Sequence, residues 1–392
     1  MKNMKNDTIF ARKFRFFAML GRRILRIKAF KTIYAYAVTG KMTQEEAARQ
    51  LSASCEAVRD LYLFMLSIIP YLTAESRSRI EAARGKLNPT EEDLNPNLKF
   101  ASNALSALLE GDPDFCKLLE RKKLSWAPYD IFIREVFDSM SGKDWFRSYM
   151  AAPGKSLKED CKLFTRVFEE EFVDNAALEP ILEDISLLWV DDLAYALTWC
   201  CYTMNDFARG RSWSLPPLYM SEVIEKKDPT VESDKDFVEK LLRSAVASYG
   251  KYSEMTAASV TQWEKDRLFD TDLVLISMGL AEAELFPDIP VKVTINEYVD
   301  ISKFYSTPKS SSFVNGLLDT LFPTAPVLIC LGLAEAATFP QIPVKVTINE
   351  YVEISKYYST PKSRAFVNSL LDKLIQQLAA EGGIVKSGAG LK

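Results

Sequence analysis

An internal repeat constrains the fold of this 392-residue chain more than any other feature. Residues 276–321 return as residues 329–374, and the two copies are identical at 35 of their 46 aligned positions. Solenoid repeats diverge much further than this, and two copies are fewer than a solenoid needs. The repeat is therefore interpreted as a recent tandem duplication, or as an artefact of sequence assembly, and not as an ancient array.

Each copy has the pattern of three helices. In copy one the first helix is predicted at about 271–285, the second from Pro290 to about Tyr305, and the third from Thr307-Pro308. Proline is favoured at the first position of a helix, because the N–H that it lacks would have no partner there. In the second helix apolar residues recur every four positions, which is typical of a face packed in a bundle. Lys292, Asn296 and Lys303 form a polar stripe beside it, which also fits an ordinary solvated face.

Helical periodicity also dominates the rest of the chain. A helix is predicted at about 22–38, ending before Gly40, and Thr43 to Glu46 form a capping box that opens the next helix toward Pro70. Irregular stretches are predicted at 83–97 and 209–236. Further helices are predicted at about 98–110, 113–123, 129–140, 156–173, 176–206 and 236–268.

Composition excludes several classes of function. The chain has no histidine, which rules out Ser-His-Asp and Cys-His catalysis and the usual histidine-containing metal sites. Its six cysteines show no C-x-x-C spacing, so they are interpreted as buried thiols in a reducing cytosol. No apolar stretch is judged long enough to span a membrane, and the first twenty residues are treated as a basic tail, with Met19 as an alternative start. A soluble, cytoplasmic protein without cofactor or metal is expected.

Two separate motifs resemble the NusB family of transcription antitermination factors. The segment IPVKVTINEYVDISKFYSTPKSSSFVNGLLD (289–319) is similar to the C-terminal signature of that family, and RRILRIKAFKTIYAY (22–36) resembles its arginine-rich first helix. Trp263-Glu264-Lys265-Asp266-Arg267 also resembles the long NusB proteins of Bacteroidetes. The motifs stand in the correct order and cover about a third of the chain.

The resemblance implies an all-α fold of two helical subdomains. We expect a basic tail or upstream extension at 1–20, a NusB-type bundle at 21–322 with a large helical insertion at about 75–235, and a duplicated C-terminal unit and tail at 323–392. The implied function is non-catalytic. NusB-like proteins bind boxA RNA together with NusE, a small-subunit ribosomal protein, and reach other Nus factors and RNA polymerase indirectly.

The RNA site that the resemblance implies lies at the basic amino end, where residues 1–31 hold ten Lys or Arg against one acid. Basic side chains bind phosphates, while aromatic rings stack on unpaired bases. Carried over position by position, the RNA-binding residues are Arg22, Arg23, Arg26, Tyr34, Lys309 and Phe313. On residue pattern alone, the favoured interpretation is that the two aromatic residues belong to the core and the arginines to a solvated helix start; the resemblance favours the RNA site.

A partner-binding carboxylate for NusE is implied at Asp272, whose counterpart in copy two is Ala325. Copy one also keeps the family-like segment Trp263 to Arg267 before its first helix, and copy two lacks this segment. Copy one is therefore expected to pack against the rest of the bundle. Departures from the family pattern include Lys31, Tyr298 and the turn Ser306-Thr307-Pro308-Lys309. These departures bear on the RNA contacts more than on the fold.

Two other classes of function compete with RNA binding. One is a protein-interaction scaffold in which the duplicated unit mediates oligomerisation. The other is an enzyme, since NusB-like domains occur fused to RNA cytosine methyltransferases. No glycine-rich cofactor loop or Pro-Cys nucleophile is present, and Asp191-Asp192 alone is a weak magnesium signal. A non-enzyme is therefore predicted.

Overall fold

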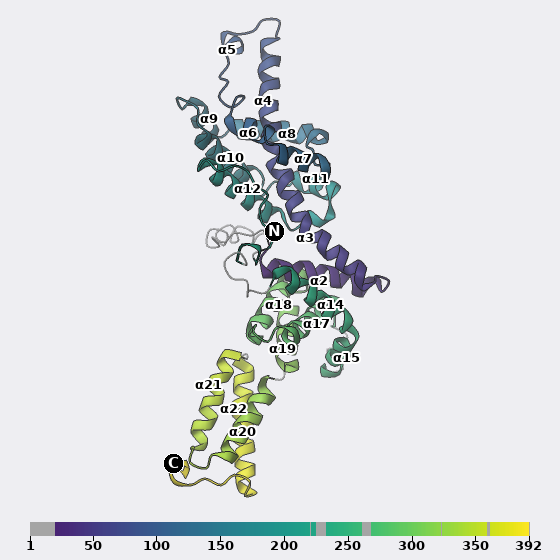
Figure 1. Ribbon diagram of the computed structural model, residues 1–392, viewed down its shortest axis with the longest axis vertical. Coiled ribbons are helices and arrows are strands. Elements are labelled where there is room, and N and C mark those ends of the chain that lie inside the picture. The colour runs from purple at the N-terminus through teal and green to yellow at the C-terminus, as the bar shows by residue number, and fades with distance from the viewer. Residues whose placement is uncertain are drawn as a thin grey trace. The chain divides into compact units, whose positions relative to one another are not determined.

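The computed structural model describes residues 20–219, 221–224, 233–260, 268–322, 324–358 and 361–391. These residues form helices joined by turns, and the β-type pairing among them is an isolated bridge between Leu20 and Tyr219 (Figure 1). This confirms the all-α fold class. The residues divide into two compact units, and the boundary between the units falls inside a helix, after Leu51.

The first unit comprises residues 1–21 and 52–234 and contains most of the predicted insertion. Its helices are α3 (Gln44–Leu66, from Ser52 onward), α4 (Ile68–Arg84), α5 (Glu91–Leu94), α6 (Ala104–Glu110), α7 (Pro113–Lys122), η1 (Ala127–Tyr129), α8 (Asp130–Ser141), α9 (Asp144–Ala151), α10 (Leu157–Glu171), α11 (Leu178–Ile185), η2 (Leu187–Trp189), α12 (Leu193–Ala208) and α13 (Ser221–Ile224).

Aromatic side chains fill the core of this unit. The rings of Phe64 and Trp126 stack at a centroid distance of 4.0 Å, and the indole N–H of Trp126 donates to the carbonyl of Phe64 at 2.8 Å. Buried Tyr62 shares a hydrogen bond of 2.8 Å with Thr203 and accepts another of 3.0 Å from Trp213. Because an unpaired polar group is costly inside a protein, these bonds let Trp and Tyr contribute their apolar area to the core.

The second unit comprises residues 22–51 and 235–392. Its helices are α2 (Arg22–Thr39), the first part of α3, α14 (Asp234–Ala247), α15 (Tyr249–Ser259), α17 (Asp270–Leu285), α18 (Val291–Tyr305), α19 (Ser310–Leu321), α20 (Thr324–Thr338), α21 (Val344–Tyr358), α22 (Pro361–Ala380) and η3 (Gly388–Leu391). Copy one supplies α17, α18 and α19, which pack on one another, and α17 also packs on α2 and α15.

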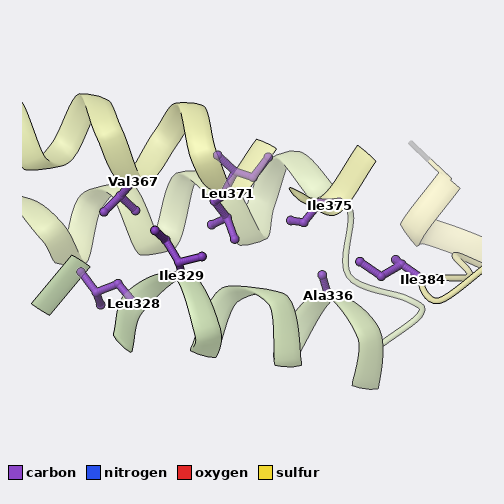
Figure 2. Close-up of a cluster of buried hydrophobic side chains, with 8 residues drawn as sticks. Leu328, Ile329, Ala336, Val367, Leu371, Ile375 and Ile384 are labelled. Atoms are coloured by element: carbon purple, nitrogen blue, oxygen red, sulfur yellow. The ribbon is translucent and has the colours of Figure 1, made fainter. Parts of the chain in front are cut away.

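Copy two supplies α20, α21 and α22, which pack together as a three-helix group (Figure 1). Its buried apolar side chains form a cluster between these helices (Figure 2). The cluster consists of Leu328, Ile329, Ala336, Ile348, Val367, Leu371, Ile375 and Ile384. Ile384 lies beyond α22, so the segment that follows α22 closes one end of this core.

Several predicted element boundaries hold. The helix at 22–38 is α2, and Gly40 follows it with a φ of +60°, a conformation that glycine adopts without strain. The capping box at Thr43 is confirmed: its hydroxyl accepts from the Glu46 N–H at 3.2 Å, and its own N–H donates to the Glu46 carboxylate at 2.8 Å.

Other predicted boundaries are wrong because the chain turns where periodicity continues. The single helix expected at 236–268 is broken at Ser248 into α14 and α15, and that expected at 176–206 is interrupted between α11 and α12. The third helix of copy one starts at Ser310, not at Thr307. The segment Trp263–Arg267 and the tail 1–19 lie outside the described residues.

Two further expectations need correction. Cys116 and Cys330 are exposed, although Cys55, Cys161 and Cys200 are buried as predicted. The stretch Gln44–Arg84 is long and apolar enough by composition to cross a membrane, but 72% of its most apolar window is buried inside the protein. Such burial is typical of a core helix in a soluble protein, which is apolar because other apolar side chains surround it.

Close approach of α17 and α19 predicts opposite effects for two alanine substitutions. A Cβ on Gly279 would lie 2.8 Å from a methyl carbon of buried Leu318, whereas nothing lies within 4 Å of one on Gly316. Gly316→Ala should raise stability by about 0.5–1 kcal/mol, because alanine favours helix. The Gly279→Ala variant should be less stable than the Gly316→Ala variant by about 1–3 kcal/mol, because its added methyl group overpacks the contact with Leu318. Urea unfolding of both variants tests this, and equal midpoints would contradict it.

Candidate nucleic-acid interface

Helix α2 carries most of the predicted RNA-binding residues, and its surroundings decide which of them face solvent. Its apolar residues, including Leu25, Phe30 and Ile33, are buried. Basic residues lie on the same helix, and two of them, Arg26 and Lys28, are buried as well. The arginine-rich motif is therefore in part a packing motif.

Arg26 lies inside the unit and forms a bidentate ion pair with Glu282 of α17. Its Nε donates to Oε2 of Glu282 at 2.7 Å, and its Nη2 donates to Oε1 at 2.8 Å. Thr294 and Tyr298 of α18 also donate to this carboxylate, at 3.0 and 2.8 Å. Burial by itself lowers the pKa of Arg26, but its bonds to Glu282 and the nearby Tyr298 raise the pKa above its ordinary value. Arg26 is thus committed to holding α2 against copy one.

Arg23 lies one turn earlier on α2 and is half exposed. It donates to Glu297 at 3.0 Å and to Asp300 at 2.5 Å, both on α18. Arg22 lies with its guanidinium 4.6 Å from the ring centroid of Phe237 in α14, a cation–π distance. Each of the three predicted arginines therefore has an internal partner.

Tyr34 and Lys309, in contrast, are exposed. The ring of Phe30 connects Tyr34 to the end of α18, since its centroid lies 6.2 Å from that of Tyr34 and 5.5 Å from that of Tyr305. Exposed Lys31 places its Nζ 5.6 Å from the Tyr305 ring centroid. Aromatic and basic side chains thus join the second half of α2 to the end of α18, and exposed Lys309 follows Tyr305 by four residues, in the α18–α19 turn.

We call this the α2–α18 surface: Lys31, Tyr34, Tyr305 and Lys309. Phe313 lies half-buried in the first turn of α19, next along the chain. The exposed ring of Tyr34 and the exposed cations together match the needs of single-stranded RNA, which offers unstacked bases and phosphates.

Asp272, the predicted partner contact, is buried near the start of α17. Its carboxylate accepts hydrogen bonds from the hydroxyls of Ser306 at 2.7 Å and Ser310 at 2.9 Å. Burial raises the pKa of Asp272, while these two bonds act in the opposite direction. In this structure Asp272 therefore fixes the α18–α19 turn that carries Lys309 and does not itself face solvent.

The described residues contain no group of three Cys, Asp or Glu side chains arranged to hold a metal ion. Asp192, one of the two acids considered for magnesium, is buried at the amino end of α12.

Comparisons with known proteins agree with the C-terminal motif at 289–319, and the family model does not reach the motif at 22–36. The model of the NusB family matches residues 211–323 and again 320–376, so its second match falls on copy two. A transcription antitermination protein NusB of Listeria monocytogenes is 33% identical over 120 residues, which are 94% of that protein and 29% of this chain. The chain belongs to the NusB family.

Two other NusB proteins are similar over shorter stretches. That of Chloroherpeton thalassium is 39% identical over 88 residues, which cover 42% of it and 22% of this chain. That of Salinibacter ruber is 35% identical over 89 residues, which cover 56% of it and 23% of this chain. No solved structure matches the chain. The NusB assignment therefore rests on sequence.

Sequence reasoning missed the acids that bind the arginines of this NusB-family chain. Glu282 and Glu284 are the two acids of the otherwise apolar run ISMGLAEAELF, and an acid on the buried side of such a helix usually signals a buried ionic partner. That signal could have paired one of them with an arginine. Glu297 and Asp300 carry no such mark, because acids on a half-exposed helix are common.

The two ion pairs predict very different costs of truncation. Arg26→Ala should reduce the free energy of unfolding by about 3–5 kcal/mol, because it leaves the carboxylate of Glu282 buried without a cation. Arg23→Ala should cost about 1 kcal/mol or less, since water screens its half-exposed pairs. Denaturant unfolding of both variants measures the difference. Similar losses would mean that Arg26 is not the buried anchor of α2.

Proposed function

We propose that this protein is an antitermination factor that binds boxA-type single-stranded RNA together with NusE during transcription of ribosomal RNA. Its relatives are named transcription antitermination proteins, which supports the general role. The observation that carries the RNA part is the α2–α18 surface, where exposed Tyr34 and Lys309 lie on elements joined by packed aromatic rings.

The proposed contacts differ from the set that the resemblance implied. Tyr34 and Phe313 would stack on bases, and Lys31 and Lys309 would contact phosphates. Arg22, Arg23 and Arg26 would act mainly by fixing α2, since each is engaged inside the unit. Phe304, an exposed aromatic residue beside Tyr305, adds a further ring to this proposed site.

For NusE we propose the start of α17 as the docking region. Asp272 would contribute by holding the α18–α19 turn through Ser306 and Ser310. Phe269 and Asp270, which precede it, are exposed and supply the surface. Other Nus factors and RNA polymerase would be reached indirectly, in the cytoplasm.

Replacing Tyr34 tests base stacking. Tyr34→Ala should weaken binding of a boxA-like single strand by about 1–3 kcal/mol, the usual cost of losing one stacked base. The matched control is Tyr195→Ala in α12, because both tyrosines are 37% exposed. Fluorescence anisotropy with labelled RNA measures both. If the two variants bind like the unmodified protein, Tyr34 does not contact RNA, and the scaffold alternative becomes the better explanation.

Replacing Lys309 tests the phosphate contact. Lys309→Ala should weaken binding to all single strands alike and lower the dependence of log K on log salt by about 0.7, because one fewer phosphate is neutralised. The control is Lys117→Ala, an exposed lysine of α7 in the other unit. A salt titration between 50 and 200 mM is sufficient. An unchanged slope would place the RNA elsewhere.

A further inference from the structure

Copy one shows what kind of helix its surface binds. Helix α2 lies against Glu282 of α17 and Glu297 of α18, and its arginines at 23 and 26 pair with these acids. Ile301 lies one turn beyond Glu297 and is buried. The surface thus combines two carboxylates with an apolar stripe, and its occupant combines two arginines one turn apart with apolar residues.

Copy two keeps this surface. Glu335 and Glu350 stand where copy one has Glu282 and Glu297, and Ile354 stands where it has Ile301. Copy two therefore keeps both acids and the isoleucine of this surface. Asp300, the second acid bound to Arg23, is replaced conservatively by Glu353.

The carboxylate of Glu335 is already oriented for an arginine. Thr347 donates to its Oε1 at 2.9 Å and Tyr351 to its Oε2 at 3.3 Å, the same two donors that hold Glu282. Within the described part of the chain, no Arg or Lys side chain pairs with Glu335, whereas Glu282 receives two bonds from Arg26. The site is preorganised without its cation.

The apolar part of this surface is exposed in copy two. Ile354 is 36% exposed, whereas Ile301 is 2% exposed. Leu331 is 50% exposed, whereas its counterpart Met278, on the helix that packs against α2 and α15, is fully buried. The equivalent helix α20 packs on α21 and α22. The residues that differ in exposure therefore map the surface that neighbouring helices cover in copy one.

We propose that copy two is a docking surface for an amphipathic helix of a partner protein, one that carries two arginines one turn apart beside an apolar stripe. The charge complementarity is that of Arg23 and Arg26 with copy one. The chain's own α2 is already engaged by copy one, and so is that of every other copy of the chain, so the occupant is a separate protein. This inference goes beyond RNA binding and does not depend on it.

A peptide of residues 21–40 serves as the probe, because it has the chemistry of the proposed occupant. Titrated into the full-length protein by fluorescence anisotropy, it should bind saturably and more weakly as salt is added. Glu335→Gln should weaken binding by about 10- to 100-fold through loss of a charge-assisted hydrogen-bond pair. Ile354→Asp should weaken binding to a similar extent by placing a charge in the apolar stripe. A peptide with Arg23→Ala and Arg26→Ala should bind the unmodified protein as weakly as the original peptide binds these variants.

The matched control is Val346→Asp. Val346 is 45% exposed and its counterpart Val293 is 43% exposed, so this position lies off the docking surface in both copies. Thermal melts by circular dichroism establish whether each variant stays folded. If Ile354→Asp does not fold, the result with Glu335→Gln decides the test. Absence of binding, or binding that survives Glu335→Gln, overturns the proposal. Self-association of the protein that Glu335→Gln abolishes would also overturn it, by making a second copy the occupant.

Discussion

In the second unit, one buried ion pair joins α2 to copy one. Arg26 of α2 and Glu282 of α17 come from sequence positions 256 residues apart, and the described contacts of α2 with copy one are arranged around them. Removing two charges from water is costly, so a pair like this is stable only when its remaining hydrogen-bonding capacity is filled. Thr294 and Tyr298 fill it on the carboxylate side. The pair therefore specifies which face of α2 packs against which face of α17.

This interaction changes the meaning of the basic amino end. A cluster of arginines in a chain with a net charge of −4 indicates a nucleic-acid contact, and the family resemblance points the same way. In the folded unit the arginines are largely used for internal pairing, which leaves lysines and aromatic residues to form the exposed α2–α18 surface. Both uses fit one helix, because the arginines lie in its first two turns and Lys31 and Tyr34 lie in its second half.

The duplication illustrates how one sequence can occupy two environments. The two copies share 35 of 46 residues and fold into the same three helices, since caps, periodicity and the glycine that admits a leucine are common to both. Their burial differs because α2 packs against α17 of copy one. An identical Ile is therefore core in one copy and surface in the other.

The sequence by itself determined the helical class, the repeat, the position of α2 and the capping box at Thr43, because these follow from local periodicity and short-range hydrogen bonds. It also determined the family, through motifs that resemble those of NusB proteins and stand in the same order. It did not reveal the break at Ser248, where periodicity continues across a turn. Only the tertiary structure decided which predicted site residues face solvent. Arg26 and Asp272 are buried against partners that lie far away in the sequence and meet them only in the folded chain, and no local pattern encodes that meeting. These partners are Glu282 for Arg26, and Ser306 and Ser310 for Asp272.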